Sequence, residues 1–306
     1  MIRALRSSVL AAVALGVPFA ASARAAEIAV VKSGPVAAWQ PALAALRAAL
    51  PGHTVTEYDL GNSRAEAARV VPTVRGQAPV VVAFGPLAAQ VMREMLTGVP
   101  LVYCMVNDPA EIGLQGASNT TGVVLFAPVR NQLAAFRAVN PTARRVGIVV
   151  SSPAARRYAD EAIRAGSGLG LEIVVAGITS VTQVPQTMRE MLTGRQAVDA
   201  VWMLPDPILT DNATRRFMLS AALDARKPVY ASSAALVAEG ALVSHAPDLA
   251  SIGQSAGELV SRILAGQKAE RLPPVVPRSE VLINRRIADN LRLALTPQVL
   301  QAAKLF

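Results

Sequence analysis

Short apolar runs recur along this chain, and the intervals between them are each long enough for one helix. Two series of runs rich in β-branched residues occupy residues 27–31, 54–58, 79–84 and 99–105, then 146–150, 171–176, 200–204 and 228–231. Strands that alternate with helices in this way form mainly parallel sheets covered by helices on both faces. At 306 residues the chain also exceeds the usual size of one hydrophobic core. The pattern therefore predicts an α/β fold with two Rossmann-like lobes.

The first 25 residues have the features of a cleavable secretory signal peptide. Arg3 and Arg6 precede an apolar stretch over residues 9–21, and Ala23-Arg24-Ala25 matches a cleavage site. The apolar stretch is too short for a convincing membrane span, and no cysteine stands at the cleavage site to carry a lipid. We predict cleavage after Ala25 and a periplasmic mature protein.

The segment from Gly98 to Phe126 has the pattern of a ligand-binding strand end. An apolar strand over residues 99–105 is followed by Asn107-Asp108-Pro109-Ala110-Glu111, in which Asp108 has the position of an N-cap and Pro109 that of the first helical residue. A parallel strand that leads through a polar loop to a helix start is where open α/β sheets bind ligands.

Applied to both series, this rule selects ten candidate ligand-binding residues. They are Ser33, Trp39, Phe84, Gly85, Asn107, Asp108 and Thr121 in the first series, and Ser152, Asp206 and Ser232 in the second. Hydroxyl and backbone N–H groups suit a ligand carboxylate, whereas Asp108 or Asp206 suits an ammonium. The set therefore indicates a small amphoteric solute such as an amino acid.

Every candidate also has a purely structural interpretation. Asp108 and Asp206 both precede proline and are good N-caps without any ligand, and the serines are common loop caps. Trp39 and Phe84 are large enough to be core residues, and Thr121 lies in a turn-forming context. The sequence leaves these alternatives open.

The sequence gives little support for a reactive cysteine, a metal site, a dinucleotide-binding loop or a nucleic-acid-binding surface. The single cysteine, Cys104, lies inside an apolar strand, which indicates a buried thiol, and His53 and His245 have no partners at metal-ligand spacing. Residues 166–170 are rich in glycine but end a helix, the reverse of a dinucleotide-binding loop. The formal charge of +9 comes from scattered arginines instead of a basic stripe, which argues against nucleic acid as a partner. We expect no metal, no cofactor and no enzymatic activity.

Two groups of motifs resemble a known family. The first group consists of VPLVYCMVNDPAEIGL at residues 99–114 and NTTGV at 119–123, and the second lies at 239–242, 253–266, 272–273 and 282–284. Both groups are similar to ABC-transporter substrate-binding proteins, a family related to aromatic amino-acid uptake proteins. The matches cover most of residues 79–295. The first loop, SGPVAAW, differs from the pattern of aromatic amino-acid uptake proteins, so the resemblance does not identify the ligand.

The resemblance implies a type I periplasmic binding protein whose two lobes are joined by a hinge of three segments. Crossings are expected near 123–128, 240–244 and 272–277, with lobe 1 formed by residues 26–125 and 241–272 and lobe 2 by 126–240 and 273–306. A monomer that closes around a small-molecule solute and delivers it to an ABC permease is implied. Two alternatives remain: a module of the same fold that serves a membrane sensor or chemoreceptor, and an exported α/β enzyme.

Overall fold

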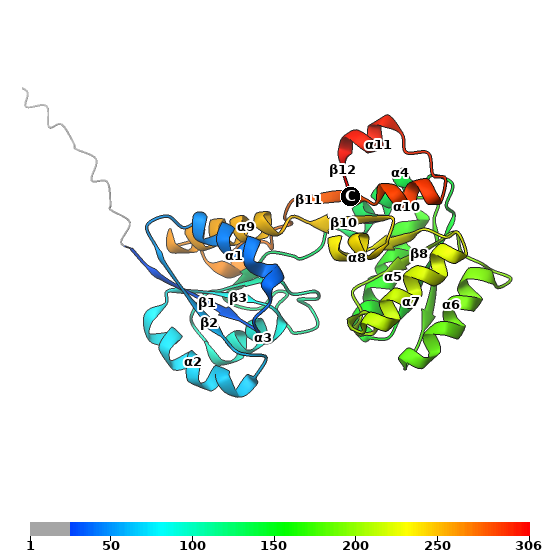
Figure 1. Ribbon diagram of the computed structural model, residues 1–306. Coiled ribbons are helices and arrows are strands. Elements are labelled where there is room, and N and C mark those ends of the chain that lie inside the picture. Colours follow the sequence, from blue (N-terminus) through cyan, green and yellow to red (C-terminus); the bar gives the residue numbers. More distant parts are fainter. Residues whose placement is uncertain (1–24) are drawn as a thin grey trace, which may run out of the picture.

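The computed structural model describes residues 25–306 and shows two lobes, each built on one helix-covered sheet (Figure 1). The expected signal peptide lies almost entirely outside the described residues. Within the described residues, no helix combines the length and the apolar character that crossing a membrane requires. The expectation of an α/β fold with two lobes is confirmed.

The first lobe contains a five-stranded sheet in the order β2-β1-β3-β4-β5, in which all neighbours are parallel. Its strands are β1 (Glu27–Lys32), β2 (Thr54–Asp59), β3 (Val80–Phe84), β4 (Leu101–Cys104) and β5 (Thr120–Gly122). Its helices are η1 (Ala37–Trp39), α1 (Gln40–Ala48), α2 (Arg64–Gln77), α3 (Pro86–Met95), α9 (Leu249–Leu264) and η4 (Ala269–Arg271). The four strands expected from the first apolar series all form.

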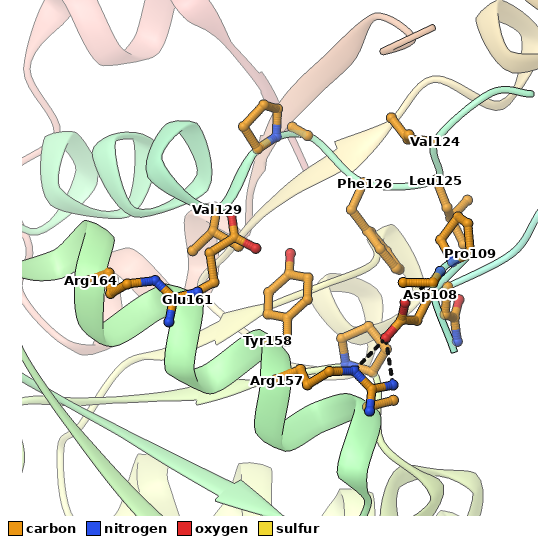
Figure 2. A pocket seen from close by; sticks show the side chains of 16 residues that line it. Asp108, Pro109, Val124, Leu125, Phe126, Val129, Arg157, Tyr158, Glu161 and Arg164 are labelled. Carbon is orange, nitrogen blue, oxygen red and sulfur yellow. Dashed lines mark hydrogen bonds and ion pairs between the residues drawn. The ribbon is translucent and has the colours of Figure 1, made fainter. Parts of the chain in front are cut away.

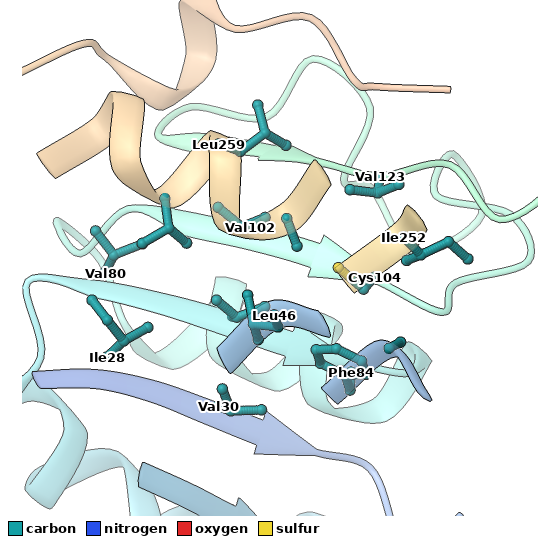
Figure 3. Packing of buried hydrophobic residues seen from close by; sticks show 14 of the residues in the cluster. Ile28, Val30, Leu46, Val80, Phe84, Val102, Cys104, Val123, Ile252 and Leu259 are labelled. Carbon is teal, nitrogen blue, oxygen red and sulfur yellow. The ribbon is translucent and has the colours of Figure 1, made fainter. Parts of the chain in front are cut away.

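Alternate residues of these strands serve opposite faces of the sheet, as the two-residue period of a strand requires. Ile28 and Val30 of β1 point toward α1 and α9 (Figure 3), whereas Ala29 and Val31 belong to the cluster under α2 and α3. Cys104 is fully buried in the first of these clusters. The expected buried thiol is therefore confirmed, and burial raises the pKa of this thiol far above the ordinary value.

Helices α1 and α9 approach each other closely because α9 carries glycine at the contact. A Cβ atom added at Gly253 would lie 1.9 Å from the carbonyl oxygen of Ala42 and 2.9 Å from the backbone nitrogen of Leu46. Gly257 meets Ala49 one turn further along α9. These small residues let the two backbones pack almost directly against each other over the sheet.

The second lobe contains a seven-stranded sheet in the order β12-β11-β10-β9-β8-β6-β7. Its strands are β6 (Arg145–Val150), β7 (Glu172–Gly177), β8 (Ala200–Met203), β9 (Val229–Ala231), β10 (Val243–Pro247), β11 (Ser279–Ile283) and β12 (Ala303–Leu305). Its helices are α4 (Val129–Val139), α5 (Pro153–Ser167), η2 (Val181–Gln183), α6 (Val184–Thr193), η3 (Pro207–Thr210), α7 (Asn212–Asp224), α8 (Ala234–Glu239), α10 (Arg285–Asn290) and α11 (Pro297–Ala302). The strands expected from the second apolar series are all present.

The expected boundary of the second lobe needs one correction. β10 pairs with β9 in parallel and with β11 in antiparallel orientation, so residues 243–247 belong to the second sheet. The chain therefore returns to the first lobe at Asp248, between β10 and α9, and not near residues 240–244. The apolar run at 241–243 was insufficient to show this, because a strand of either sheet has the same composition.

Three segments join the lobes, and they are hydrogen-bonded to one another. The backbone N–H of Val124 donates to Val275 at 2.9 Å, which pairs the first crossing with the third. The N–H of Asp248, at the second crossing, donates to the carbonyl oxygen of Arg278 at 2.9 Å. Three linked segments limit twisting of the lobes but leave bending possible, as in hinged domains.

Candidate functional site

The space between the lobes is divided into three adjoining cavities of about 380, 600 and 680 Å³. Asn107, after β4, lines all three. Ser232 and Ser233, after β9, line the two larger cavities, and Phe126 of the first crossing lines the smallest and the largest. Since the cavities share walls from both lobes, we treat them as one interlobe cleft.

The loop after β4 does not form the helix that its sequence predicts. Residues 109–113 make a tight turn, with the N–H of Leu114 donating to Pro109 at 2.8 Å, and Gly113 and Gly116 have positive φ angles of 69° and 70°. Two residues in the left-handed region prevent the helix from continuing. Asp108 still caps this turn, because its Oδ1 accepts from the N–H groups of Ala110 at 3.0 Å and Glu111 at 3.2 Å.

Asp108 also forms an ion pair across the cleft. Arg157, on α5 of the second lobe, donates from Nε at 3.0 Å and from Nη2 at 2.7 Å to Oδ2 of Asp108 (Figure 2). The carboxylate of Glu111 lies 3.7 Å from the same guanidinium. The hydrogen bond to Asp108 is the main cause that raises the pKa of Arg157. Both carboxyl oxygens of Asp108 are therefore already engaged.

Asp206 is likewise occupied by its own lobe. Its carboxylate accepts from the N–H of Ser151 at 2.8 Å and of Ile208 at 3.0 Å, and from the hydroxyl groups of Ser151 and Ser152. These bonds tie the loop after β8 to the loop after β6. A buried carboxylate with four donors has its hydrogen bonds satisfied within the lobe and needs no ligand cation. Asp206 lines the 600 Å³ cavity, but its hydrogen bonds favour the structural alternative.

The apolar wall of the largest cavity comes mainly from the first lobe and the first crossing. Trp39, Met105, Ile112, Leu125 and Phe126 line it. The ring of Trp39 packs against Phe84 at a centroid distance of 6.2 Å. Phe126 meets Tyr158 of α5 edge to face at 6.3 Å, so the wall continues into the second lobe.

Four of the ten candidates support the cleft from behind and do not line its cavities. Phe84 is fully buried in the core, and the hydroxyl of Ser33 accepts from the N–H of Ala88 at 2.9 Å in the first turn of α3. Thr121 donates to the carbonyl oxygen of Leu272 at 2.9 Å, which ties β5 to the third crossing. The fourth is Gly85. The other six, Trp39, Asn107, Asp108, Ser152, Asp206 and Ser232, are brought together at the cleft.

Replacing Gly85 with alanine is expected to displace Trp39 from the cleft wall. Gly85 has a φ of 93°, and a Cβ atom there would lie 2.6 Å from Oγ of Ser33 and 2.7 Å from Cη2 of Trp39. The variant should shift the emission of Trp39, measured with Trp202→Phe as background, and should lower stability by about 1–3 kcal/mol. Gly52→Ala, at a φ of 82° with nothing within 4 Å, tests backbone strain alone. An emission spectrum unchanged by Gly85→Ala would contradict this account of the wall.

Several cleft residues were missed by the sequence reasoning. Glu111 and Phe126 face the cleft because the turn and the first crossing fold beside it, and Arg157 and Ser233 come from the second lobe. In the sequence, Glu111 stood out only as the last residue of the polar segment 107–111, and Arg157 lies on a helix with no motif. Among residues 25–306, no group of three or more His, Cys, Asp or Glu side chains is placed to hold a metal ion.

Comparison with known proteins agrees with this architecture. A family model described as ABC transporter substrate binding protein matches residues 45–305. No curated protein matches the chain in sequence.

Three solved structures share the fold at low sequence identity. An ABC domain from Streptococcus pneumoniae in complex with L-Trp has a TM-score of 0.70 and 21% identity over 92% of this chain and 99% of its own. A ligand-free, open substrate binding protein with adhesive properties from Clostridium difficile has a TM-score of 0.80 and 17% identity, with the same coverage. A periplasmic ribose ABC transporter protein from Conexibacter woesei has a TM-score of 0.60 and 12% identity over 89% of this chain and 96% of its own.

Proposed function

The chain belongs to the family of ABC transporter substrate binding proteins, and from this membership we propose that it is the periplasmic component of an importer for an amino acid or related carboxylate. The two lobes close around the solute by bending at the three crossings. The loaded protein then delivers the solute to its permease. Export through the predicted signal peptide, cleaved after Ala25, brings the protein to the periplasm.

The chemistry of the interlobe cleft is the observation that carries this proposal. The acidic edge formed by Asp108 and Glu111 suits an ammonium group mainly through Glu111, because Arg157 is the one guanidinium paired with these two carboxylates among residues 25–306 and it lies 3.7 Å from Glu111. On the opposite lobe, Ser232 brings a hydroxyl group to the two larger cavities, both of which it lines. It is available to donate to a solute carboxylate.

The wall of Trp39, Leu125 and Phe126 would pack against the apolar part of the solute. Aromatic and aliphatic surface contributes about 25 cal/mol for each Å² removed from water, which supplies affinity, while the few polar groups set orientation. The solved neighbours bind L-Trp in one case and are described for ribose in another, so the fold itself accepts several solute classes. The acidic edge favours a solute with an ammonium over a neutral sugar.

A thermal-shift screen of residues 26–306 against amino acids, other small carboxylates, sugars and purines tests the proposal. A solute present at about 100 times its dissociation constant stabilises the folded protein by about 2.7 kcal/mol, which raises Tm visibly. We expect stabilisation by an amino acid or related carboxylate and none by sugars. A sugar as the best solute would contradict the proposed class.

Glu111→Gln is expected to weaken binding of the solute found in this screen. Glutamine keeps the shape of the side chain but removes the charge, and the lost charge-assisted bond corresponds to about 1.5 kcal/mol, or roughly tenfold in Kd by calorimetry. Glu258→Gln on α9 is the matched control, since in the described part of the chain the side chain of Glu258 accepts a hydrogen bond from Gln254 on its own helix. Equal affinities of wild type and Glu111→Gln would remove Glu111 from the site.

A further inference from the structure

The contact between Arg157 and Asp108 differs in kind from the other polar contacts of the cleft, because it joins the two lobes. Among the described residues, the only ion pairs that bridge the lobes away from the crossing segments are those of Arg157 with Asp108 and Glu111. Arg278 and Asp248, at 3.7 Å, pair inside the hinge itself. We propose that Arg157 is a latch that holds the lobes together in the solute-free protein and sets how far the cleft opens.

The acceptor is preorganised for this role. Two backbone N–H groups of the turn, from Ala110 and Glu111, hold Oδ1 of Asp108, so Oδ2 is turned toward the second lobe. Arg157 binds that oxygen through two nitrogens, a contact whose geometry is more restrictive than a single bond. Little further ordering of Asp108 is needed to form the contact.

The donor comes from a rigid element. Arg157 lies on α5, whose first turn is capped by Ser152 through the N–H of Ala155 at 3.2 Å. Ser152 is itself bonded to Asp206 at 3.3 Å, which links α5 to the loop after β8. A movement of the second lobe therefore moves Arg157 as part of that lobe.

A weak contact is sufficient to control such a movement. Open and closed states of hinged binding proteins differ by little in free energy, so small contributions change their populations. Exposed ion pairs are individually weak, and loss of this pair should change the ratio of open to closed lobes by roughly two- to fivefold. Screening by salt should have the same effect as removing the pair.

Electron spin resonance distance measurements on the solute-free full mature chain test the latch without any ligand. Spin labels at Thr73→Cys on α2 and Arg189→Cys on α6 would report the separation of the outer ends of the lobes (Figure 1), and the native Cys104 is fully buried. We expect Arg157→Ala to lengthen and broaden the distance distribution at low salt. Asp108→Asn, which keeps the acceptor for the turn, should do the same.

The controls separate the latch from a general effect of charge. Arg156→Ala removes a guanidinium one residue away whose ion pair, within residues 25–306, is with Asp160 on its own helix, and this variant should leave the distance distribution unchanged. High salt should shift the distance distribution of the wild type toward that of Arg157→Ala, and it should leave the distribution of Arg157→Ala unchanged. Identical distributions for wild type and Arg157→Ala at low salt, or an equal shift from Arg156→Ala, would overturn the proposal. Because no solute is present, neither result bears on the solute class proposed above.

Discussion

Replacing Ala235 with tryptophan is expected to abolish solute binding while leaving the fold intact. Ala235 lies on the exposed side of α8 and lines both larger cavities of the cleft. An indole there would occupy the space in which the solute has to contact Ser232. We expect Kd to rise by at least about 100-fold, equivalent to about 2.7 kcal/mol, measured by calorimetry with the solute from the thermal-shift screen.

The matched control for this variant is Ala238→Trp. Ala238 is exposed on the same helix and lines none of the three cavities. Tryptophan is less favourable than alanine in a helix by at most about 0.7 kcal/mol, so both variants should unfold near the wild-type temperature. Wild-type affinity in Ala235→Trp would show that the solute binds elsewhere, whereas loss of affinity in Ala238→Trp would point to a defect of α8.

Gly253→Ala is expected to lower the free energy of unfolding by about 2–3 kcal/mol, although alanine is the better helix former. The added methyl group would overlap the backbone of α1 at Ala42 and Leu46, and a helix backbone cannot move aside as a side chain can. Helices α1 and α9 would have to separate above the sheet. Urea titration followed by circular dichroism measures the loss.

Gly76→Ala is the control that isolates this steric effect. Gly76 lies within α2, and nothing approaches within 4 Å of a Cβ atom added there. That variant should gain up to about 1 kcal/mol from helix propensity. If Gly253→Ala also gained stability, the close contact between α1 and α9 would not exist in solution.

The arrangement of strands and helices could be predicted from local patterns. Runs such as residues 80–84 are apolar throughout because both faces of a parallel strand are buried, and turns such as Ser151-Ser152-Pro153 begin helices by their own capping chemistry. The position of β10 could not be predicted, since neighbouring strands are chosen by the packing of the whole sheet. The helix predicted after Asp108 does not form, which shows that prediction can also be wrong for neighbouring residues. Two glycines with positive φ angles end the turn although Asp108 is a good N-cap.

Only some of the residues that line the cleft could be predicted from the sequence. Residues after strand ends, such as Asn107 and Ser232, can be placed because parallel strands all end at one edge. Whether such a residue contacts the solute or stabilises the fold depends on the hydrogen bonds that its side chain forms with the rest of the protein. Asp206 is saturated by donors from Ser151, Ser152 and Ile208, while Thr121 is bonded to Leu272, and neither contact has a sequence signal.

By itself, the sequence determined the strands, the helix caps, the two-lobed α/β class and the edges of the sheets at which a ligand can bind. These properties depend on the period of apolar residues and on neighbours within a few positions. Only the tertiary structure decided that Arg157 reaches Asp108 across the cleft, and that Gly253 lets α9 lie against α1. Those contacts join residues far apart in the chain, and their free energies depend on distances and orientations that exist only after the lobes have folded.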